Sequence, residues 1–399
     1  MDRPRLVDVI GRSGPLSGVR VIDLCRQLPG AFATGLLGDM GAEIIKIEAP
    51  GDGDPMRAYE PRIGASSAYT WVTDRNKRSV ALNLRDPRGA ALVRRLASTA
   101  DAVLESFRPG VAERLGVGPA EMQRENPRLV YCSISGYGAS GPLAGEAGHD
   151  INYIGRAGML SVTGVDGRPA IPGVQVADLA GGALMGLTGL LAAMLNAART
   201  GRGDHVEVSM TDGAFALMAV NLAVNFAGGH EPGWESELLN GSVPCYNVYA
   251  CADGRHLTVG ALEEKFWIAL CEGVDRADLI GTRLDGGAVH EWRSHFATRT
   301  RDEWLARLDR ADACVGPVNS VSEATRDPQL LARGMYLEVQ HPSLGSIGQI
   351  GCPIGFRDHP PFAPACAPSL GESTRSVLEE LGVAQEEIET LATEGVTLM

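Results

Sequence analysis

The run Gly18-Val19-Arg20-Val21-Ile22-Asp23-Leu24 is β-rich, and it begins the alternation that decides the fold. A helical pattern from Gly30 to Met40 follows it, and a second β-rich run, Ala42-Glu43-Ile44-Ile45-Lys46-Ile47, comes next. The same alternation returns over residues 79–133. Repeated strand–helix units predict an α/β fold whose open, Rossmann-like sheet is mostly parallel and carries helices on both faces.

The chain is long enough for a second lobe. Its 399 residues, 44% of them hydrophobic, exceed what one ordinary core holds. A Gly-containing stretch at 228–233 marks the exit from the first lobe. We therefore expect a large α/β domain over residues 1–228, a small α+β domain over residues 229–334, and a C-terminal segment, residues 335–399, that returns to the large domain.

The charge and the cysteine content of the chain indicate which partners and which cellular compartment to expect. The net charge is −13, with 49 acidic and 36 basic residues and no basic stripe, so nucleic acid is not an expected partner. The 8 cysteines form no CxxC pair, and the N-terminus lacks an apolar signal core. These features favour the reducing cytoplasm, without disulfides or structural zinc.

One uncharged stretch, Leu179 to Ala198, raises the question of a membrane span. It is rich in Gly and Ala, stands alone, and has Asp178 directly before it. We therefore expect a buried helix and no membrane partner.

The common cofactor motifs are missing. The sequence contains no GxGxxG fingerprint, no GxxxxGK[ST] loop, no HExxH helix and no GxSxG elbow. We expect no metal, nicotinamide or flavin cofactor.

Three residues are candidates for chemistry, and each has an ordinary structural interpretation. His149 follows a turn-rich segment and fits a surface loop. Asp178 fits the N-cap of the apolar helix, since a carboxylate there accepts backbone N–H bonds. Glu263 fits the first turn of another helix.

The blocks around these residues resemble a known family. They are Ala147-Gly148-His149-Asp150-Ile151-Asn152-Tyr153, Ala177-Asp178-Leu179-Ala180-Gly181-Gly182, Tyr249-Ala250-Cys251-Ala252-Asp253-Gly254, Val259-Gly260-Ala261-Leu262-Glu263 and Asp312-Ala313-Cys314-Val315-Gly316-Pro317-Val318. In order and spacing they resemble the family III CoA-transferases (CaiB/BaiF-like), in particular the α-methylacyl-CoA racemase branch. The similarity runs from about Leu16 to about Leu381.

The resemblance implies an acyl-CoA substrate and roles for the three candidates. His149 and Asp178 match the two proton-transfer groups of the racemases, and Glu263 matches the carboxylate that orients the histidine. Inversion of a carbon next to a thioester needs a proton removed from one face and another returned to the opposite face, which two such groups can do. Backbone N–H groups where the apolar helix begins, near Asp178, are suited to hold the enolate oxygen. The resemblance also implies an interlocked homodimer and no cofactor beyond the coenzyme A of the substrate.

The resemblance also suggests coenzyme A ligands. Arg114 matches a family arginine at the nucleotide end, and Phe107 a residue that lines the same cleft. The turn that contains Arg75 and Lys77 looks like a basic turn suited to phosphates. Racemases typically place an arginine after the acidic residue that ends the second strand, but Ala49 stands there, so we expect Arg57 to supply the charge.

Two other functions stay open. In CoA-transferases of the same fold, the carboxylate matching Asp178 is a nucleophile that forms a mixed anhydride with the acyl group. His149 favours the racemase, because a transferase needs no second proton carrier. The third alternative is a non-catalytic acyl-CoA-binding protein. The sequence does not identify the acyl group.

Overall fold

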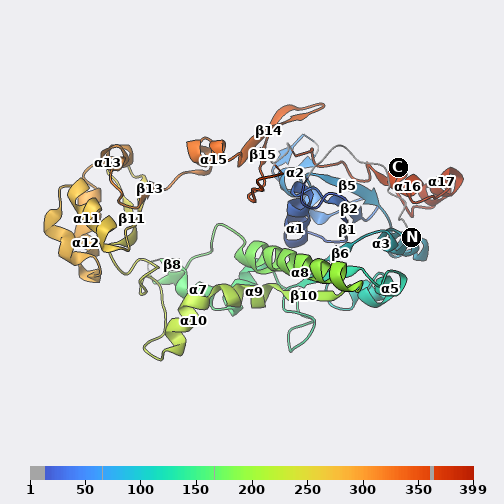
Figure 1. Ribbon diagram of the computed structural model, residues 1–399, viewed down its shortest axis with the longest axis horizontal. Coiled ribbons are helices and arrows are strands. Elements are labelled where there is room, and N and C mark those ends of the chain that lie inside the picture. Colours follow the sequence, from blue (N-terminus) through green and yellow to red (C-terminus); the bar gives the residue numbers. More distant parts are fainter. Residues whose placement is uncertain (1–13, 65, 166, 360–363) are drawn as a thin grey trace. The chain divides into compact units, whose positions relative to one another are not determined.

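The computed structural model describes residues 14–64, 66–165, 167–359 and 364–399, and its largest sheet has six strands (Figure 1). The strand order is β10-β7-β6-β1-β2-β5, and every neighbouring pair is parallel. The strands are β1 (Arg20–Asp23), β2 (Glu43–Glu48), β5 (Lys77–Ala81), β6 (Ala102–Glu105), β7 (Val130–Ser135) and β10 (His205–Ser209). The predicted α/β class with an open parallel sheet is confirmed.

Helices cover both faces of this sheet. One face carries α1 (Leu28–Asp39) and a long apolar helix made of η2 (Ala177–Leu184) and α8 (Met185–Thr200). The opposite face packs on α3 (Pro87–Ser98), α5 (Pro119–Glu125), α16 (Thr374–Glu380) and α17 (Gln385–Thr393). Strand residues such as Ile22 and Val80 join Leu96 and Leu378 in the buried core of this second face. Alternate strand residues face opposite layers, as in any doubly covered parallel sheet.

The strand order reverses at β1. From there the chain builds β2 and β5 on one side and β6, β7 and β10 on the other. In open parallel sheets ligands bind outside the carboxyl ends of the strands at such a switch point. Here the loop after β1 lies against the loop after β6, because Leu24 N donates to Leu104 O at 2.8 Å and Arg26 N donates to Ser106 Oγ at 2.9 Å.

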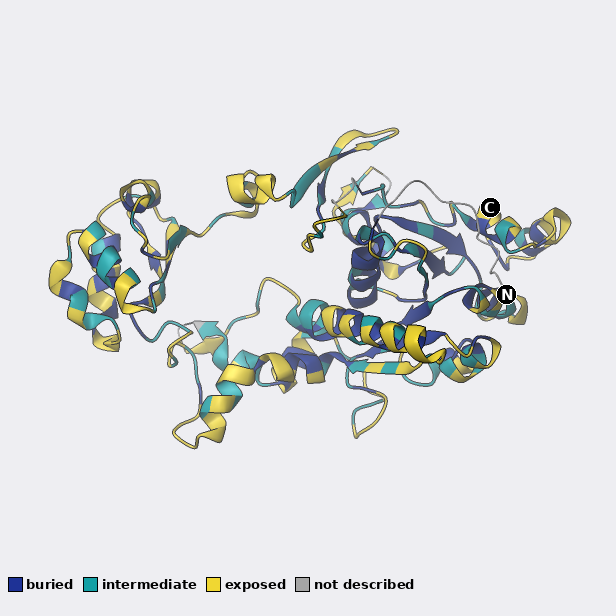
Figure 2. Cartoon of the chain, viewed as in Figure 1, coloured by how far each residue is buried: buried dark blue, intermediate teal, exposed yellow. Residues whose placement is uncertain are grey.

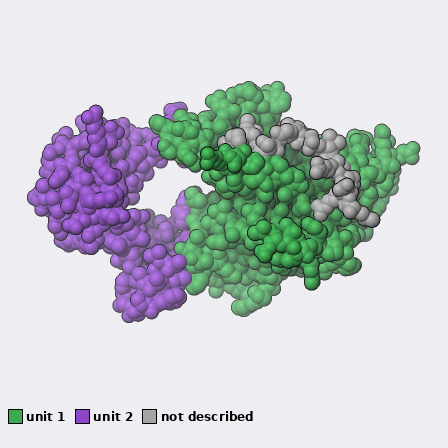
Figure 3. All heavy atoms as spheres, in the orientation of Figure 1, with its two compact units in different colours: residues 1–157, 174–217, 328–399 green, residues 158–173, 218–327 purple. Residues whose placement is uncertain are grey.

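The structure divides into two compact units (Figure 3). Unit one comprises residues 1–157, 174–217 and 328–399, and unit two comprises residues 158–173 and 218–327. The predicted boundaries at residues 228 and 334 thus lie close to, but not at, the chain crossings at 217 and 327. The excursion at 158–173 had no signal in the sequence.

Unit two has its own antiparallel sheet and aromatic core. The sheet joins β11 (Tyr246–Ala250), β12 (His256–Gly260) and β13 (Val315–Pro317). Three tryptophans, Trp267, Trp292 and Trp304, are fully buried under α11 (Glu264–Gly273), α12 (Val289–Phe296) and α13 (Arg301–Leu308). Its remaining elements are α7 (Met159–Val162), β8 (Gly164–Val165), β9 (Arg168–Pro169), α10 (Ala219–Phe226), η3 (Ala277–Thr282), η4 (Gly286–Ala288) and α14 (Val321–Ala324).

The C-terminal segment rejoins unit one through a hairpin of β14 (Tyr336–His341) and β15 (Gly345–Ile350). Trp71 Nε1 donates to Gly348 O at 3.0 Å, and Gln349 Nε2 donates to Trp71 O at 2.9 Å. The other elements of unit one are η1 (Pro55–Ala58), β3 (Arg62–Ile63), β4 (Ser66–Ser67), α2 (Ala68–Thr73), α4 (Val111–Arg114), α6 (Asp150–Arg156), α9 (Met210–Leu217) and α15 (Pro328–Ala332).

The helix Ala177–Thr200 has the length and hydropathy that a membrane span requires, but one side of it packs on unit one. A side chain at Gly181 would meet the backbone of α9 at Met210 O, 2.8 Å away, so the two helices touch through glycine. The other side leaves Leu184, Met185 and Leu195 exposed in the single chain, and Figure 2 shows the exposed stripe along α8. The predicted buried helix is therefore buried along one side only in the single chain.

Candidate active site

His149 stands at the start of α6, just beyond the carboxyl end of β7. It is the N-cap of that helix, and its backbone N–H donates to Asn152 Oδ1 at 3.0 Å. Asn152 N in turn donates to His149 O at 2.8 Å. The residue is exposed, as the surface-loop interpretation expected. The backbone is thus fixed while the imidazole remains accessible.

Asp178 lies inside its helix and is not the N-cap, so the capping interpretation was wrong. The N-cap is Val176, and Asp178 belongs to the π-helical turn η2, in which Gly181 and Gly182 are buried. Insertions of π-helix within longer helices are frequent at functional sites. The two glycines permit this helix to pack closely on α9. From the sequence alone, the segment was recognisable only as a helix rich in small residues.

Asp150 connects His149 to Asp178. Its Oδ1 accepts a hydrogen bond from Asp178 N at 2.9 Å, which joins the first turns of α6 and η2. Burial, and then the negative charge of Asp150, raise the pKa of the Asp178 carboxyl to about 7. The backbone N–H of Asp178, which we expected to hold an enolate oxygen, is engaged by Asp150 in this structure. Sequence reasoning missed Asp150, although its place directly after His149 was visible.

Tyr153 supports the loop that carries His149. Its Oη donates to Gly148 O at 2.5 Å, and its ring packs edge-on against Tyr137 with ring centroids 5.1 Å apart. A side chain at Gly136 or Gly148 would collide with the Tyr153 ring. Burial, followed by the charge of Asp178, raises the pKa of Tyr153 to about 12. Tyr153 therefore stays a neutral donor near neutral pH.

Glu263 belongs to unit two. It is the N-cap of α11, and its backbone oxygen accepts from Phe266 N and Trp267 N, each at 3.1 Å. The side chain is exposed and makes no capping hydrogen bond. Its pairing with His149 stays a prediction.

Phe107 lines a small cavity at the carboxyl ends of β6 and β7, beside the first half of β10, in unit one. Arg108, Ser133 and His205 share this lining. Glu105 lies at its floor, where burial raises the pKa of the carboxyl to about 7 against the opposing hydrogen bonds from Ser133 and Phe107 N. Arg114, on α4, is exposed. The cavity and Arg114 are thus next to the switch point of the sheet.

The other three cations that we expected at coenzyme A phosphates are used by the fold. Arg75 is buried and binds both carboxylate oxygens of Asp39, at 3.0 and 2.5 Å. Lys77 is fully buried between Asp23, at 3.1 Å, and Asp74, at 2.8 Å. Arg75 and Lys77 are thus part of the folded core of unit one, and their charges are already neutralised by carboxylates, so they are poorly suited to bind a ligand phosphate.

Arg57 does return to the end of β2, where the sequence lacks the racemase arginine. It binds Glu48 through two bonds of 2.7 Å, and its third contact is Pro368 O at 3.2 Å. The side chain is 14% exposed. Arg57 therefore neutralises Glu48, and, like Arg75 and Lys77, it is engaged by a carboxylate of the fold.

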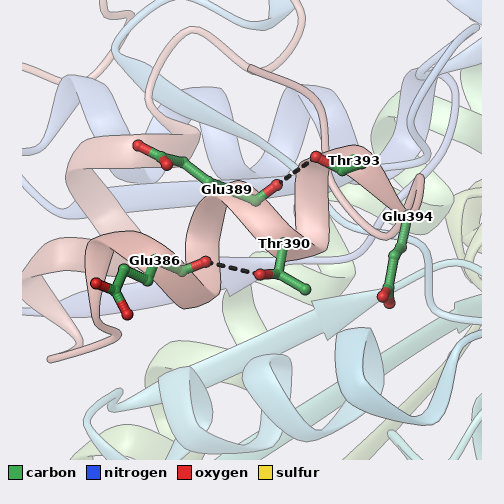
Figure 4. A pocket seen from close by; sticks show the side chains of 5 residues that line it. All are labelled: Glu386, Glu389, Thr390, Thr393 and Glu394. Carbon is green, nitrogen blue, oxygen red and sulfur yellow. Dashed lines mark hydrogen bonds between the residues drawn. The ribbon is translucent and has the colours of Figure 1, made fainter.

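A larger hollow lies elsewhere, along α17 (Figure 4). Its volume is about 290 Å³, and it is lined by Glu386, Glu389, Thr390, Thr393 and Glu394. Both threonine hydroxyls donate to carbonyls of their own helix, at 2.8 and 2.9 Å. It contains no histidine and no nucleophile beyond these hydroxyls, so it does not compete with the His149 region. Among the described residues, no group of His, Cys, Asp and Glu side chains has a metal-binding arrangement.

His149 and Asp178, with its raised pKa, lie in neighbouring helix starts of the doubly wound α/β unit, and such a group of perturbed residues is a candidate active site. The chain belongs to CoA-transferase family III, whose model matches residues 16–374, and the resemblance described above is confirmed.

Curated relatives of both kinds align over nearly the whole chain. The succinyl-CoA:glutarate CoA-transferase of Mus musculus is 33% identical, covering 96% of this chain and 90% of that protein. The α-methylacyl-CoA racemase of Homo sapiens is 34% identical, covering 94% and 95%. Among solved structures, a CAIB/BAIF family protein from Brucella suis superimposes with a TM-score of 0.81 at 29% identity, covering 93% of this chain and all of that one. The chain is therefore an enzyme of the family III transferase and racemase type.

Proposed function

We propose that this protein is an acyl-CoA racemase, which inverts the α-carbon of a 2-methylacyl-CoA thioester by 1,1-proton transfer through an enolate. The observation that carries the proposal is the Asp178 carboxyl, whose pKa is raised to about 7 beside Asp150. A group that titrates near the working pH can both take and return a proton, which a racemase requires of each partner.

His149 supplies the second proton carrier. It is exposed and adjoins the residue that accepts from Asp178 N, and we expect one substrate carbon to face both groups. Tyr153 fixes the preceding carbonyl of Gly148 at 2.5 Å, which limits the movement of the His149 loop. A nucleophilic carboxylate needs neither this histidine nor a raised pKa, and both features favour the racemase over the transferase.

The transferase remains the second candidate, because the similarity to transferases is just as extensive. A succinate–glutarate CoA-transferase of Agrobacterium fabrum is 35% identical over 97% of this chain. In that reaction Asp178 would attack the thioester carbonyl, release the CoA thiolate and form an aspartyl mixed anhydride. The thiolate would attack the Asp178 carbonyl of this anhydride and release the first carboxylate, leaving an aspartyl-CoA thioester. The second carboxylate would attack that thioester and free the thiolate, which forms a new anhydride. Attack of the thiolate on the new acyl carbonyl would then give the new acyl-CoA and regenerate Asp178.

For the coenzyme A end we propose the crevice outside β1 and β6, with Phe107 and Arg114 as ligands. Phe107 lies in the loop after β6 and lines the cavity beside that loop, and Arg114 is exposed on α4, which follows the same loop. Nucleotides bind at this position in open parallel sheets, and arginine is suited to phosphate. We expect no metal or nicotinamide cofactor, so exhaustive chelation should leave turnover unchanged.

We further propose that the chain acts as an interlocked homodimer in the cytoplasm, in which Glu263 of one chain orients His149 of the other. In unit one, Ile151, Leu184, Met185, Phe215 and Leu217 are 37–49% exposed. Removal of apolar area from water contributes about 25 cal/mol per Å², so a second copy that covers this surface would be stabilised.

Solvent deuterium exchange distinguishes the two candidate reactions. A racemase incorporates deuterium at the α-carbon of a 2-methylacyl-CoA in deuterium oxide without any acceptor acid. His149→Ala and Asp178→Ala should each lower racemisation by about 10²–10⁴-fold. Glu146→Gln, an exposed change in the preceding loop, is the matched control and should leave the rate unchanged.

A transferase gives the opposite pattern. CoA would move only after a second carboxylic acid is added, hydroxylamine would trap an acyl group on Asp178, and His149→Ala would have a mild effect. Acceptor-dependent transfer without deuterium at the α-carbon would overturn the racemase proposal.

A further inference from the structure

Arg26 lies in the loop after β1, at the switch point of the sheet, and no sequence pattern indicated it. Its guanidinium lies over the ring of Phe107, with Cζ 5.6 Å from the ring centroid. The side chain is exposed, and no carboxylate pairs with it among the residues that the structure describes. Arg26 thus presents an unneutralised, fixed cation at the crevice.

The backbone around Arg26 is held on both sides. Its N–H donates to Ser106 Oγ at 2.9 Å, and that hydroxyl donates to Arg26 O at 3.0 Å. The next residue, Gln27, has φ 63° and ψ −162°, a positive-φ conformation that is nearly restricted to glycine and costs another residue about 1–3 kcal/mol. A glutamine keeps this conformation only where its surroundings impose it.

Asp54 imposes the turn. Both of its carboxylate oxygens accept from Gln27 N at 3.2 Å, and Oδ1 also accepts from Met56 N at 2.9 Å. Lys46 Nζ fixes Oδ2 at 2.9 Å, and Asp54 is 2% exposed. The buried network below the sheet edge therefore determines the path of the chain immediately after Arg26.

The charges near the crevice leave few cations for a phosphate. Arg75, Lys77 and Arg57 are neutralised by Asp39, Asp74 and Glu48 within the fold. Arg26, Arg108 and Arg114 are exposed and have no ion-pair partner in the described part of the chain. In a protein of net charge −13, a polyanionic ligand needs such local positive charge. Of these three arginines, Arg26 is the one that stacks on an aromatic ring, that of Phe107. Its backbone N–H and carbonyl oxygen are both hydrogen-bonded to the Ser106 hydroxyl.

We propose that Arg26 binds a phosphate group of the coenzyme A nucleotide, and that Asp54 is a positioning residue that acts through the positive-φ turn at Gln27. This inference rests on the proposed acyl-CoA function and adds to it the group that recognises the phosphate. Arginine binds phosphate through charge-assisted, often bidentate hydrogen bonds, and stacking on Phe107 keeps its plane fixed.

The direct test is calorimetric titration of free coenzyme A into wild type, Arg26→Ala, Arg26→Lys and Arg202→Ala. Arg202 is an exposed arginine before β10, at the opposite edge of the same sheet, and serves as the matched control. Arg26→Ala should raise the Kd by about tenfold to a hundredfold, as expected for one charge-assisted contact. Arg26→Lys should fall between wild type and alanine, and Arg202→Ala should match wild type.

A truncated substrate shows which part of the ligand Arg26 contacts. With an acyl-CoA, Arg26→Ala should raise KM while kcat for α-deuterium exchange stays within about threefold, since uniform binding is lost. With the corresponding acyl-pantetheine thioester, which lacks the nucleotide, wild type and Arg26→Ala should have the same KM. Equal losses on both substrates, or an unchanged Kd for coenzyme A, would overturn the role of Arg26.

A rescue experiment tests whether Asp54 positions Arg26 through the turn at Gln27. Asp54→Asn should weaken coenzyme A binding by about tenfold, and adding Gln27→Gly should recover part of that loss, because glycine adopts φ 63° without a Cβ penalty. Absence of rescue in a double variant with a wild-type Tm would contradict positioning through Gln27. If wild type itself binds no coenzyme A, the proposed acyl-CoA function is overturned, and the inference with it.

Discussion

The carboxylate of Asp150 accepts a hydrogen bond from the backbone N–H of Asp178 at 2.9 Å, so the residue beside His149 places a negative charge next to the other candidate acid. When Asp150 is ionised, ionisation of the nearby, half-buried Asp178 is unfavourable. After burial, Asp150 is the second cause of the raised pKa of Asp178. Two consecutive residues of one segment thereby serve both halves of the proposed proton transfer.

Asp150→Asn tests this coupling. The amide oxygen can still accept from Asp178 N, but the charge is gone, so the pKa of Asp178 should fall while burial keeps it above its ordinary value. The limb of the pH–rate profile that reports Asp178 should move to lower pH. Glu146→Gln should not move it. An unchanged limb in Asp150→Asn would show that Asp150 does not perturb Asp178.

Asp178 should also destabilise the protein at neutral and higher pH. Its folded pKa of about 7 exceeds the ordinary 3.8, so the free energy of unfolding falls as pH rises through this interval. Asp178→Asn cannot ionise, and above pH 7 it should be more stable than wild type by up to about 4 kcal/mol. Urea unfolding at pH 4.5 and pH 8 measures the difference. The same difference at both pH values would be inconsistent with the raised pKa.

Tyr153→Phe should loosen the loop that carries His149. The change removes the bond from Oη to Gly148 O and leaves the ring packing intact. We expect a loss of about 1 kcal/mol in stability and a fall in kcat of about tenfold with little change in KM. Tyr137→Phe, in the ring that packs on Tyr153, is the control. A loss of stability with unchanged kcat would restrict Tyr153 to the fold.

Asp74 should be a main determinant of stability in unit one. It lies buried between Lys46, at 2.9 Å, and Lys77, at 2.8 Å. Burial opposes its charge, yet the two lysines hold the pKa of Asp74 well below its usual range. Asp74→Asn should cost about 3 kcal/mol, because each lysine loses one charged partner in a dry site, although Asp54 still binds Lys46 and Asp23 still binds Lys77. Glu389→Gln on the exposed side of α17 should cost less than about 0.5 kcal/mol.

The exposed side of α8 should be covered in solution. The chain has a mass of 42.1 kDa, and sedimentation should give twice that value. Leu195 is 64% exposed in the single chain, and Leu195→Glu should weaken the dimer, whereas Asn196→Glu should not. In an interlocked dimer, differently tagged wild-type subunits should not mix in native buffer. A wild-type monomer would remove the proposed Glu263 contribution.

Much of the fold was accessible from local patterns. The β-rich runs around Val21 and Ile45 and the helix-like stretches between them predicted the parallel sheet, because strand and helix periods depend on neighbouring residues. The blocks around His149, Asp178 and Glu263, which carry the family resemblance, are also short contiguous segments and could be recognised in the sequence. The excursion at 158–173 into unit two was not predictable, since its packing partners lie beyond residue 217.

The availability of the basic side chains for a ligand could not be predicted from the sequence. Arg75, Lys77 and Arg57 appeared as a basic surface, yet their partners Asp39, Asp23 and Glu48 lie 36, 54 and 9 residues away in the chain. Whether a charge is free or neutralised depends on which distant side chains the folded chain brings within about 3 Å, and on how much water the surrounding layers exclude.

The sequence by itself therefore determined the residue types, their order and the alternation that builds the sheet. The tertiary structure decided their protonation and availability: it gave Asp178 a pKa of about 7 beside Asp150. It also left Arg26 exposed over Phe107 before a positive-φ turn at Gln27. Local propensity acts over a few residues, but burial and Coulomb interaction act between segments that only folding brings together.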